Sequence, residues 1–154
     1  MDIENTKLPP NSIDSEQSVL GGLLLHNDSW DRVVNILSTN DFYQASHRII
    51  YDAIVTLLEH DKPADILTVK EQVTKTHDED SIGGFAYLAQ IADNTPTVSN
   101  IEAYAKHVRE LSVYRQLIKI GREIADTAFQ PKNIEVNELL DLSEKKIFEI
   151  AEQV

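Results

Sequence analysis

The sequence predicts an all-α protein, a compact cluster of short helices followed by a long antiparallel helical hairpin. Apolar residues recur at three- and four-residue steps along most of the chain, as they do on one face of a helix. No stretch shows the strict alternation of apolar and polar residues that marks a half-buried strand. Turn residues interrupt the helical pattern at short intervals up to Pro96, and the next proline is Pro131. We therefore expect a flexible arm over residues 1–11, a globular head over 12–95 and the hairpin over 96–154.

The first helix is expected to begin near residue 12. Ser12 suits an N-cap, and the acidic residues Asp14 and Glu16 would lie in the first turn, where the helix dipole favours them. The pair Gly21 and Gly22 lies inside the pattern, where each glycine costs about 1 kcal/mol relative to alanine. Because glycine permits close approach of another backbone, the pair predicts tight packing of a second helix against the first.

Four more helices complete the predicted head. Apolar residues at helical spacing indicate helices over residues 28–37, 46–59 and 85–91, the second of them clearly amphipathic. Thr68 and Glu71 form a capping-box pattern that would open another helix. The polar stretches between these segments read as loops.

The proline-free stretch after Pro96 allows one helix of about 31 residues, which would be about 46 Å long at about 1.5 Å per residue. A last amphipathic helix follows the turn at Pro131. A hairpin of this length cannot hide its apolar residues against a shorter cluster, so we expect it to pair with another copy of the chain. The self-association candidates are Ile101, Tyr104, Val108, Leu111, Leu117, Ile120, Leu139, Leu140 and Ile147.

Composition excludes several classes of protein. The 14 Lys and Arg against 26 Asp and Glu give a net charge of −12, which argues against a surface that grips nucleic-acid phosphates. Five cations, interspersed with acids, gather on the predicted long helix, where a solvated face is favoured over a nucleic-acid surface: Lys106, Arg109, Arg115, Lys119 and Arg122. The chain has no cysteine, and it shows neither an apolar run of transmembrane length nor a secretory leader. We expect a soluble, cytoplasmic domain.

The search for catalytic motifs is negative. The sequence lacks a phosphate-binding loop, a dinucleotide fingerprint, a His-Glu-x-x-His pair and a Gly-x-Ser-x-Gly elbow. Its five histidines are scattered without ligand spacing, and the acidic string that begins at Asp78 fails as a calcium loop because Ile82 occupies a ligand position. We therefore expect no catalytic residue, no metal site and no cofactor in this chain.

Seven sets of short strings follow one another along the sequence. They are Pro9-Pro10-Asn11-Ser12 with Glu16-Gln17-Ser18-Val19-Leu20-Gly21-Gly22; Asp41-Phe42-Tyr43 with His47-Arg48; Asp65 with Thr68-Val69; Gly83-Gly84 with Tyr87-Leu88; Pro96-Thr97 with Asn100-Ile101 and Tyr104-Ala105; Arg115 with Leu117-Ile118; and Leu139-Leu140-Asp141 with Glu144 and Ile147-Phe148. In this order they resemble the N-terminal domain of the bacterial DnaB-family replicative DNA helicases, and the similarity spans about residues 9 to 152.

The resemblance implies a collar on a ring hexamer, built as a trimer of dimers through the hairpins, that regulates ring assembly and docks a DnaG-type primase. In that family the ATPase motor, with its ATP and Mg, lies in a C-terminal domain after a linker, which would begin near Val154. The resemblance makes the full-length parent an ATP-dependent 5′–3′ DNA helicase, with single-stranded DNA passing only through the complete ring and no role for a membrane. It assigns the primase contacts to Asp14, Tyr87, Ile118 and Ile124.

Two other functions compete with this interpretation. A stand-alone helical adaptor or helicase mimic would have the same fold with no motor attached, and the gene sequence after Val154 would distinguish it. A small helical enzyme that uses ordinary carboxylates would need a cleft containing acids of perturbed pKa.

Overall fold

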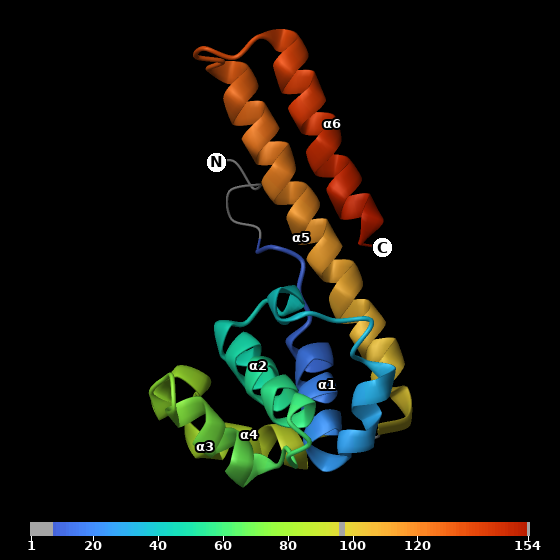
Figure 1. Ribbon diagram of the computed structural model, residues 1–154, viewed down its shortest axis with the longest axis vertical. Coiled ribbons are helices and arrows are strands. Elements are labelled where there is room, and N and C mark those ends of the chain that lie inside the picture. The colour runs from blue at the N-terminus through green and yellow to red at the C-terminus, as the bar shows by residue number, and fades with distance from the viewer. Residues whose placement is uncertain (1–7, 96–97, 154) are drawn as a thin grey trace. The chain divides into compact units, whose positions relative to one another are not determined.

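The computed structural model describes residues 8–95 and 98–153, and the regular elements within these ranges are all helices, which confirms the predicted all-α fold (Figure 1). The string Pro96-Thr97 and most of the expected arm over residues 1–11 lie outside the described residues. The α-helices are α1 (Ile13–Leu25), α2 (Ala45–Glu59), α3 (Ile66–Thr74), α4 (Gly84–Asp93), α5 (Ile101–Phe129) and α6 (Val136–Glu152); 3-10 helices are η2 (Asn27–Arg32), η3 (Thr39–Asp41), η4 (Glu79–Ile82) and η5 (Val98–Asn100).

The described residues form two compact units. One is residues 11–111, which we call the head unit, and the other combines residues 8–10 with 112–153, which we call the hairpin unit. The border lies inside α5, at Leu111, rather than near residue 95 as the sequence predicted. The reason is that the first turns of α5 contribute Ile101, Ala105 and Val108 to the buried core of the head unit.

The core of the head unit lies among α1, α2, α4 and the start of α5. The largest fully buried apolar side chains include Leu20 and Leu23 from α1, Ile50 and Ile54 from α2, and Leu88 and Ile91 from α4. Each such side chain stabilises the fold by about 1.5–3 kcal/mol relative to remaining exposed. This burial explains why four short helices, each marginal alone, fold together.

The glycine pair of α1 is where two other helices come closest. A Cβ atom built on Gly21 would lie 2.7 Å from the carbonyl oxygen of Ile91 and would overlap the hydroxyl of Thr95. A Cβ on Gly22 would lie 2.9 Å from Cδ1 of Ile101. The prediction that this pair serves tight helix packing is therefore confirmed.

Most helices follow the sequence pattern, with two corrections, which concern the start of α3 and the helix predicted over residues 28–37. Ser12 caps α1, because its hydroxyl accepts the Ser15 N–H at 3.2 Å. The helix assigned to Thr68 begins earlier: the Asp65 carboxylate accepts the Thr68 N–H at 2.9 Å, and the Thr68 hydroxyl accepts the Asp65 N–H at 2.8 Å. Thr68 is thus the third helical residue of a capping box, and the stronger acceptor Asp65 is the cap.

The second correction concerns the helix predicted over residues 28–37. The structure has the 3-10 helix η2 followed by turns instead. Its sequence, NDSWDR, is rich in Asn, Asp and Ser, whose short side chains compete for backbone hydrogen bonds and favour turns. Asn27, the first residue of η2, ties the start of this segment to its neighbours, because its amide nitrogen donates to the carbonyl oxygens of Leu23 and Ala64, both at 2.8 Å.

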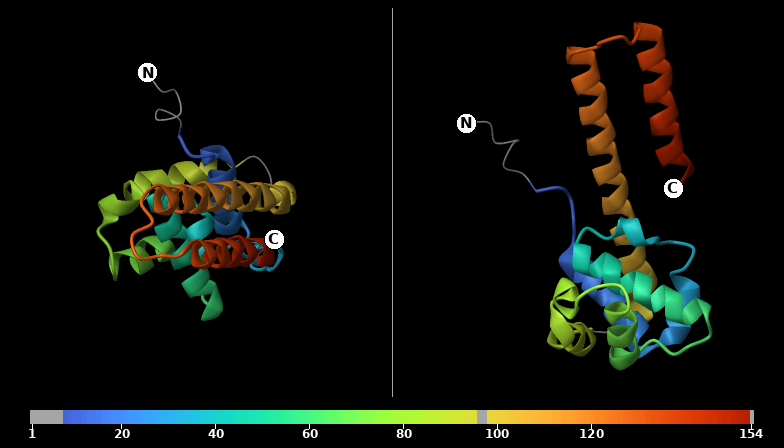
Figure 2. Two further views of the ribbon diagram at one scale, coloured as in Figure 1. Left: turned by 90° about the horizontal axis from the view of Figure 1, so that it is seen from above. Right: turned by 60° about the vertical axis from the view of Figure 1, so that its left-hand side comes forward.

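In the hairpin unit, the later part of α5 and all of α6 lie side by side and run antiparallel (Figures 1 and 2). Lys146 Nζ lies 3.1 Å from Glu123 Oε2 and links the two helices. Large apolar side chains remain exposed on both, which we describe below. In the described part of the chain, no helix has the length and apolarity that would let it cross a membrane.

Candidate protein-docking surfaces

A buried carboxylate stands at the centre of the polar structure of the head unit. Glu16, on α1, is 1% exposed, and its two oxygens receive three donors from the start of α2. Oε2 accepts the Tyr43 N–H at 2.8 Å, and Oε1 accepts the Gln44 N–H at 3.3 Å and contacts Nδ1 of His47 at 2.7 Å. The carboxylate thus accepts the N–H groups of the two residues that precede α2, at the helix end where the dipole favours negative charge.

The imidazole of His47 connects the Glu16 carboxylate to Tyr87 on α4. His47 is fully buried, and its Nε2 lies 2.6 Å from the Tyr87 hydroxyl, which also accepts the side-chain amide of Gln17 at 3.0 Å. Because a carboxylate only accepts, Nδ1 bears the proton that faces Glu16. In the neutral imidazole Nε2 is then the acceptor for the Tyr87 O–H, so each donor of this network has an acceptor. We call Glu16, His47, Tyr87 and Gln17 the polar relay.

Tyr87 is also held at its backbone end. Gly83 has φ +82°, a left-handed conformation that suits glycine, and a Cβ built on it would lie 3.1 Å from the Tyr87 Cβ. The rings of Tyr87 and His47 are close to parallel, 4° apart in plane, with centroids 5.8 Å apart. Tyr87 is half-buried, so a restrained aromatic ring reaches the surface between α1 and α4.

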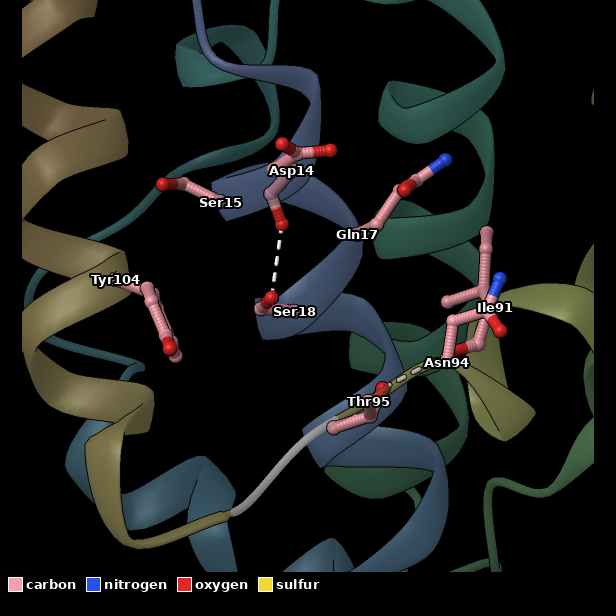
Figure 3. Close-up of a pocket in the computed structure, with 8 residues that line it drawn as sticks. All are labelled: Asp14, Ser15, Gln17, Ser18, Ile91, Asn94, Thr95 and Tyr104. Carbon is pink, nitrogen blue, oxygen red and sulfur yellow. Dashed lines mark hydrogen bonds between the residues drawn. The ribbon is translucent and has the colours of Figure 1, made fainter.

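Asp14 lies on the same unit, in a groove formed by α1, the end of α4 and α5, which Gln17 of the polar relay also lines. Figure 3 shows Asp14 and Ser18 on α1, with Tyr104 of α5 facing them and Thr95 at the lower end. The groove holds about 380 Å³. Ser18 Oγ donates to the Asp14 carbonyl at 2.8 Å, which leaves the exposed Asp14 carboxylate facing solvent. The groove can receive polar side chains of a partner.

Ile118 and Ile124 belong to the hairpin unit. Ile118 is 38% exposed and lies in a groove of about 330 Å³ with Pro9, Arg115 and Arg122, whereas Ile124 is half-buried. The structure therefore gathers Asp14 and Tyr87 in one unit and the two isoleucines in the other.

Two of the five cations expected on a solvated face are engaged within the chain. Arg109 forms an ion pair with Asp41 at 2.6 Å, and an Arg115 guanidinium N–H donates to the Pro10 carbonyl at 2.8 Å. Arg122 and Lys119 lie close to Glu123 and Asp126 around the hairpin groove. This mixed charge does not form the continuous basic stripe that phosphate binding requires.

The self-association candidates fall into three groups. Ile101 and Val108 are 1% and 2% exposed in the head core, so packing within one chain already accounts for them. The half-buried candidates are Tyr104, Leu111, Ile120 and Leu139. The exposed candidates are Leu117, Leu140 and Ile147, at 42%, 62% and 48%.

Val136 and Phe148 are not among the self-association candidates predicted from the sequence, although they are 70% and 61% exposed and lie at helical spacing from Leu140. Their spacing alone could have found them. The polar relay had no comparable signal, because His47 is 31 residues from Glu16 and 40 from Tyr87.

One side chain with a perturbed pKa bears on the alternative of a small helical enzyme. Burial raises the pKa of Tyr51 to about 12, with a further contribution from the charge of Asp41, but this phenol is 2% exposed and donates to the Leu37 carbonyl. A substrate could not reach it. Among residues 8–95 and 98–153, no three His, Asp or Glu side chains are grouped as a metal site requires.

Comparison with known proteins identifies relatives of this chain. A sequence profile of the DnaB-like helicase N terminal domain matches residues 8–110. The chain is 40% identical over 151 residues to the replicative DNA helicase DnaB of Pasteurella multocida, covering 98% of this chain and 32% of that protein. It is 38% identical over 152 residues to the replicative DNA helicase DnaC of Bacillus subtilis, covering 99% and 33%. The chain thus spans about a third of the length of these relatives.

Two solved structures are similar. The crystal structure of the N-terminal domain of DnaB helicase from Mycobacterium tuberculosis matches with a TM-score of 0.88 and 33% identity, over 92% of this chain and 99% of that one. A DnaB-like replicative helicase, described together with its interactions with primase, matches with a TM-score of 0.73 and 20% identity, over 90% of this chain and 31% of that one. At that identity the second likeness shows the fold alone.

Proposed function

The chain belongs to the family of DnaB-like helicase N-terminal domains, and from this premise we propose that it is the collar of a replicative ring helicase. In this role it pairs subunits into a hexamer and docks a DnaG-type primase in the cytoplasm. ATP, Mg and the grip on single-stranded DNA belong to a motor domain outside this chain. The observation that carries the proposal is the agreement in fold with an isolated N-terminal domain over nearly the whole of both chains.

Subunit pairing is supported by the exposed apolar side chains of α6. Val136, Leu140, Ile147 and Phe148 are each about half exposed or more and share helical spacing. Burying a side chain of this size is worth about 1.5–3 kcal/mol, so a second copy that covers the four would gain substantially. A single chain leaves them in water.

Sedimentation of the purified chain tests the pairing. We expect a dimer or larger species, and we expect Leu140→Asp to shift the chain to monomer because it places a charge among the apolar residues. Glu149→Gln, an exposed change on the same helix, is the matched control and should sediment like the parent. A parent chain that remains monomeric at high concentration would contradict this part of the proposal.

Primase docking is supported by the surface positions of Asp14, Tyr87 and Ile118 and by the fold shared with a helicase that is described with primase. Titration of the chain with the helicase-binding domain of the primase from the same organism tests it. Asp14→Lys, Tyr87→Ala and Ile118→Asp should each weaken binding by about tenfold or more. Asp78→Ala, in an exposed loop, should leave binding unchanged, and a parent chain that never binds would refute docking.

A further inference from the structure

We propose that Glu16 and His47 are positioning residues that hold the Tyr87 ring in one orientation, so that a partner meets a preformed surface between α1 and α4. The inference rests on the proposed docking function and deepens it. It assigns a role to two side chains that a partner cannot touch, since Glu16 and His47 are 1% and 0% exposed.

The Tyr87 side chain is restrained at its hydroxyl and at its Cβ. Its hydroxyl has two partners, His47 Nε2 at 2.6 Å and the Gln17 amide at 3.0 Å, and its Cβ packs on Gly83. A side chain that must be ordered on binding costs free energy, whereas one that is already ordered does not. A half-buried tyrosine with a fixed hydroxyl is therefore suited to be an anchor for a partner.

The Glu16 carboxylate determines how His47 faces Tyr87. An imidazole alone could present either nitrogen to Tyr87 and could rotate. Glu16 Oε1, 2.7 Å from Nδ1, fixes both the tautomer and the ring plane of His47, and thereby aims the Nε2 lone pair at the Tyr87 hydroxyl. Glu16 is itself fixed by the N–H groups of Tyr43 and Gln44. The backbone just before α2 thus orients Glu16, Glu16 orients His47, and His47 orients the Tyr87 ring at the surface.

A purely structural role does not explain why a polar pair, Glu16 and His47, occupies these buried positions. A buried polar pair has a desolvation cost that apolar side chains of similar volume avoid, so such a pair adds little net stability. The relay joins three helices that already share an apolar core. What apolar residues could not supply is a directional hold on one hydroxyl.

The experiment separates docking from stability. Three variants interrupt the relay: Tyr87→Phe retains the ring and loses the hydroxyl, His47→Asn retains a donor near Glu16 and loses Nε2, and Gln17→Ala removes the outer partner. Val73→Ala is the control, because it opens a cavity in the core at α3, where the side chain is 2% exposed. For each variant, urea unfolding gives the stability, and titration gives affinity for the primase domain. NMR of labelled tyrosine, or of labelled phenylalanine for Tyr87→Phe, gives the order of the ring at residue 87.

We expect Tyr87→Phe and His47→Asn to weaken docking by about tenfold and Gln17→Ala by less, with faster flipping of the ring at residue 87. Val73→Ala should lose stability and keep its affinity. Relay variants that fold and bind like the parent, while the parent binds, would overturn the positioning role alone; so would a Val73→Ala variant that binds as weakly as they do. A parent chain that does not bind overturns the proposed docking and the inference with it. If His47→Asn fails to fold, the other two relay variants decide.

Discussion

The Asp41 carboxylate and the Arg109 guanidinium, 68 residues apart in sequence, meet at 2.6 Å. Both side chains lie largely out of water, at 3% and 17% exposure. The other Asp41 oxygen accepts the Ser38 N–H at 2.8 Å and so closes the turn at η3. One carboxylate therefore fixes a turn and ties it to α5, in addition to the apolar contacts that α5 makes in the head core.

Arg109→Ala should destabilise the head unit by about 2–3 kcal/mol, because it leaves the buried Asp41 carboxylate without its countercharge. Urea unfolding followed by circular dichroism measures the change. Lys106→Ala, at an exposed position on the same helix, should alter stability by less than about 0.5 kcal/mol. Equal effects from the two variants would show that the pair adds nothing specific.

Two glycine-to-alanine substitutions should have opposite signs. Gly21→Ala forces a methyl group against the carbonyl of Ile91 and the hydroxyl of Thr95, and we expect a loss of about 1–3 kcal/mol. Gly121→Ala, in the interior of α5, meets nothing within 4 Å and should gain about 0.5–1 kcal/mol from the higher helix propensity of alanine. Unfolding midpoints of the two variants against the parent provide the test, and a gain at Gly21 would disprove the close packing.

Ile101→Asp should unfold the head unit, because it places an uncompensated charge at a position that is 1% exposed, at a cost of several kcal/mol. The substitution should disrupt the head unit rather than the hairpin, since Ile101 packs on Gly22 of α1. Asp78→Ala, in an exposed segment, is the control and should change the melting temperature very little. An Ile101→Asp chain that melts like the parent would contradict the placement of α5 in the core.

Tyr51 should make stability fall at high pH. Its folded pKa is raised from 10.0 to about 12, so the folded chain holds the phenol proton more tightly than the unfolded chain. The stabilisation is complete below pH 10.0 and is lost as pH rises toward 12, by about 2–3 kcal/mol in total. Unfolding measured through this range should decline less steeply for Tyr51→Phe than for the parent. Parallel profiles would exclude this phenol as the cause.

Local features of the fold could be predicted, and the reason is that they arise from neighbouring residues. The periodicity of residues 46–59 became α2, and the Ser12 cap and the Gly21–Gly22 packing were as expected. The helix at 28–37 was wrong because the segment begins with the sequence NDSWDR, whose Asn, Asp and Ser residues favour turns over a regular α-helix. The start of α3 was misplaced because an aspartate three residues upstream of Thr68 is the stronger acceptor.

The residues of the candidate docking surfaces could likewise be predicted only in part. Resemblance to a family supplied Asp14 and Tyr87, and helical spacing supplied Leu140 and Ile147, all of which reach the surface at least in part. The relay of Glu16 and His47 could not be derived, because the two side chains come from different helices and meet only after the core has formed. Ile101 shows the opposite error, since an apolar stripe does not reveal whether its partner is the same chain or another copy.

The border between the two units falls within a continuous helix, and this affects how the chain can be cut. Compact units are usually joined by an exposed loop that a protease can enter. Here residue 112, just past the border, is a serine that is 3% exposed and lies inside the 29-residue helix α5. Trypsin acting near this border must first unwind the helix. The two units should therefore resist proteolytic separation.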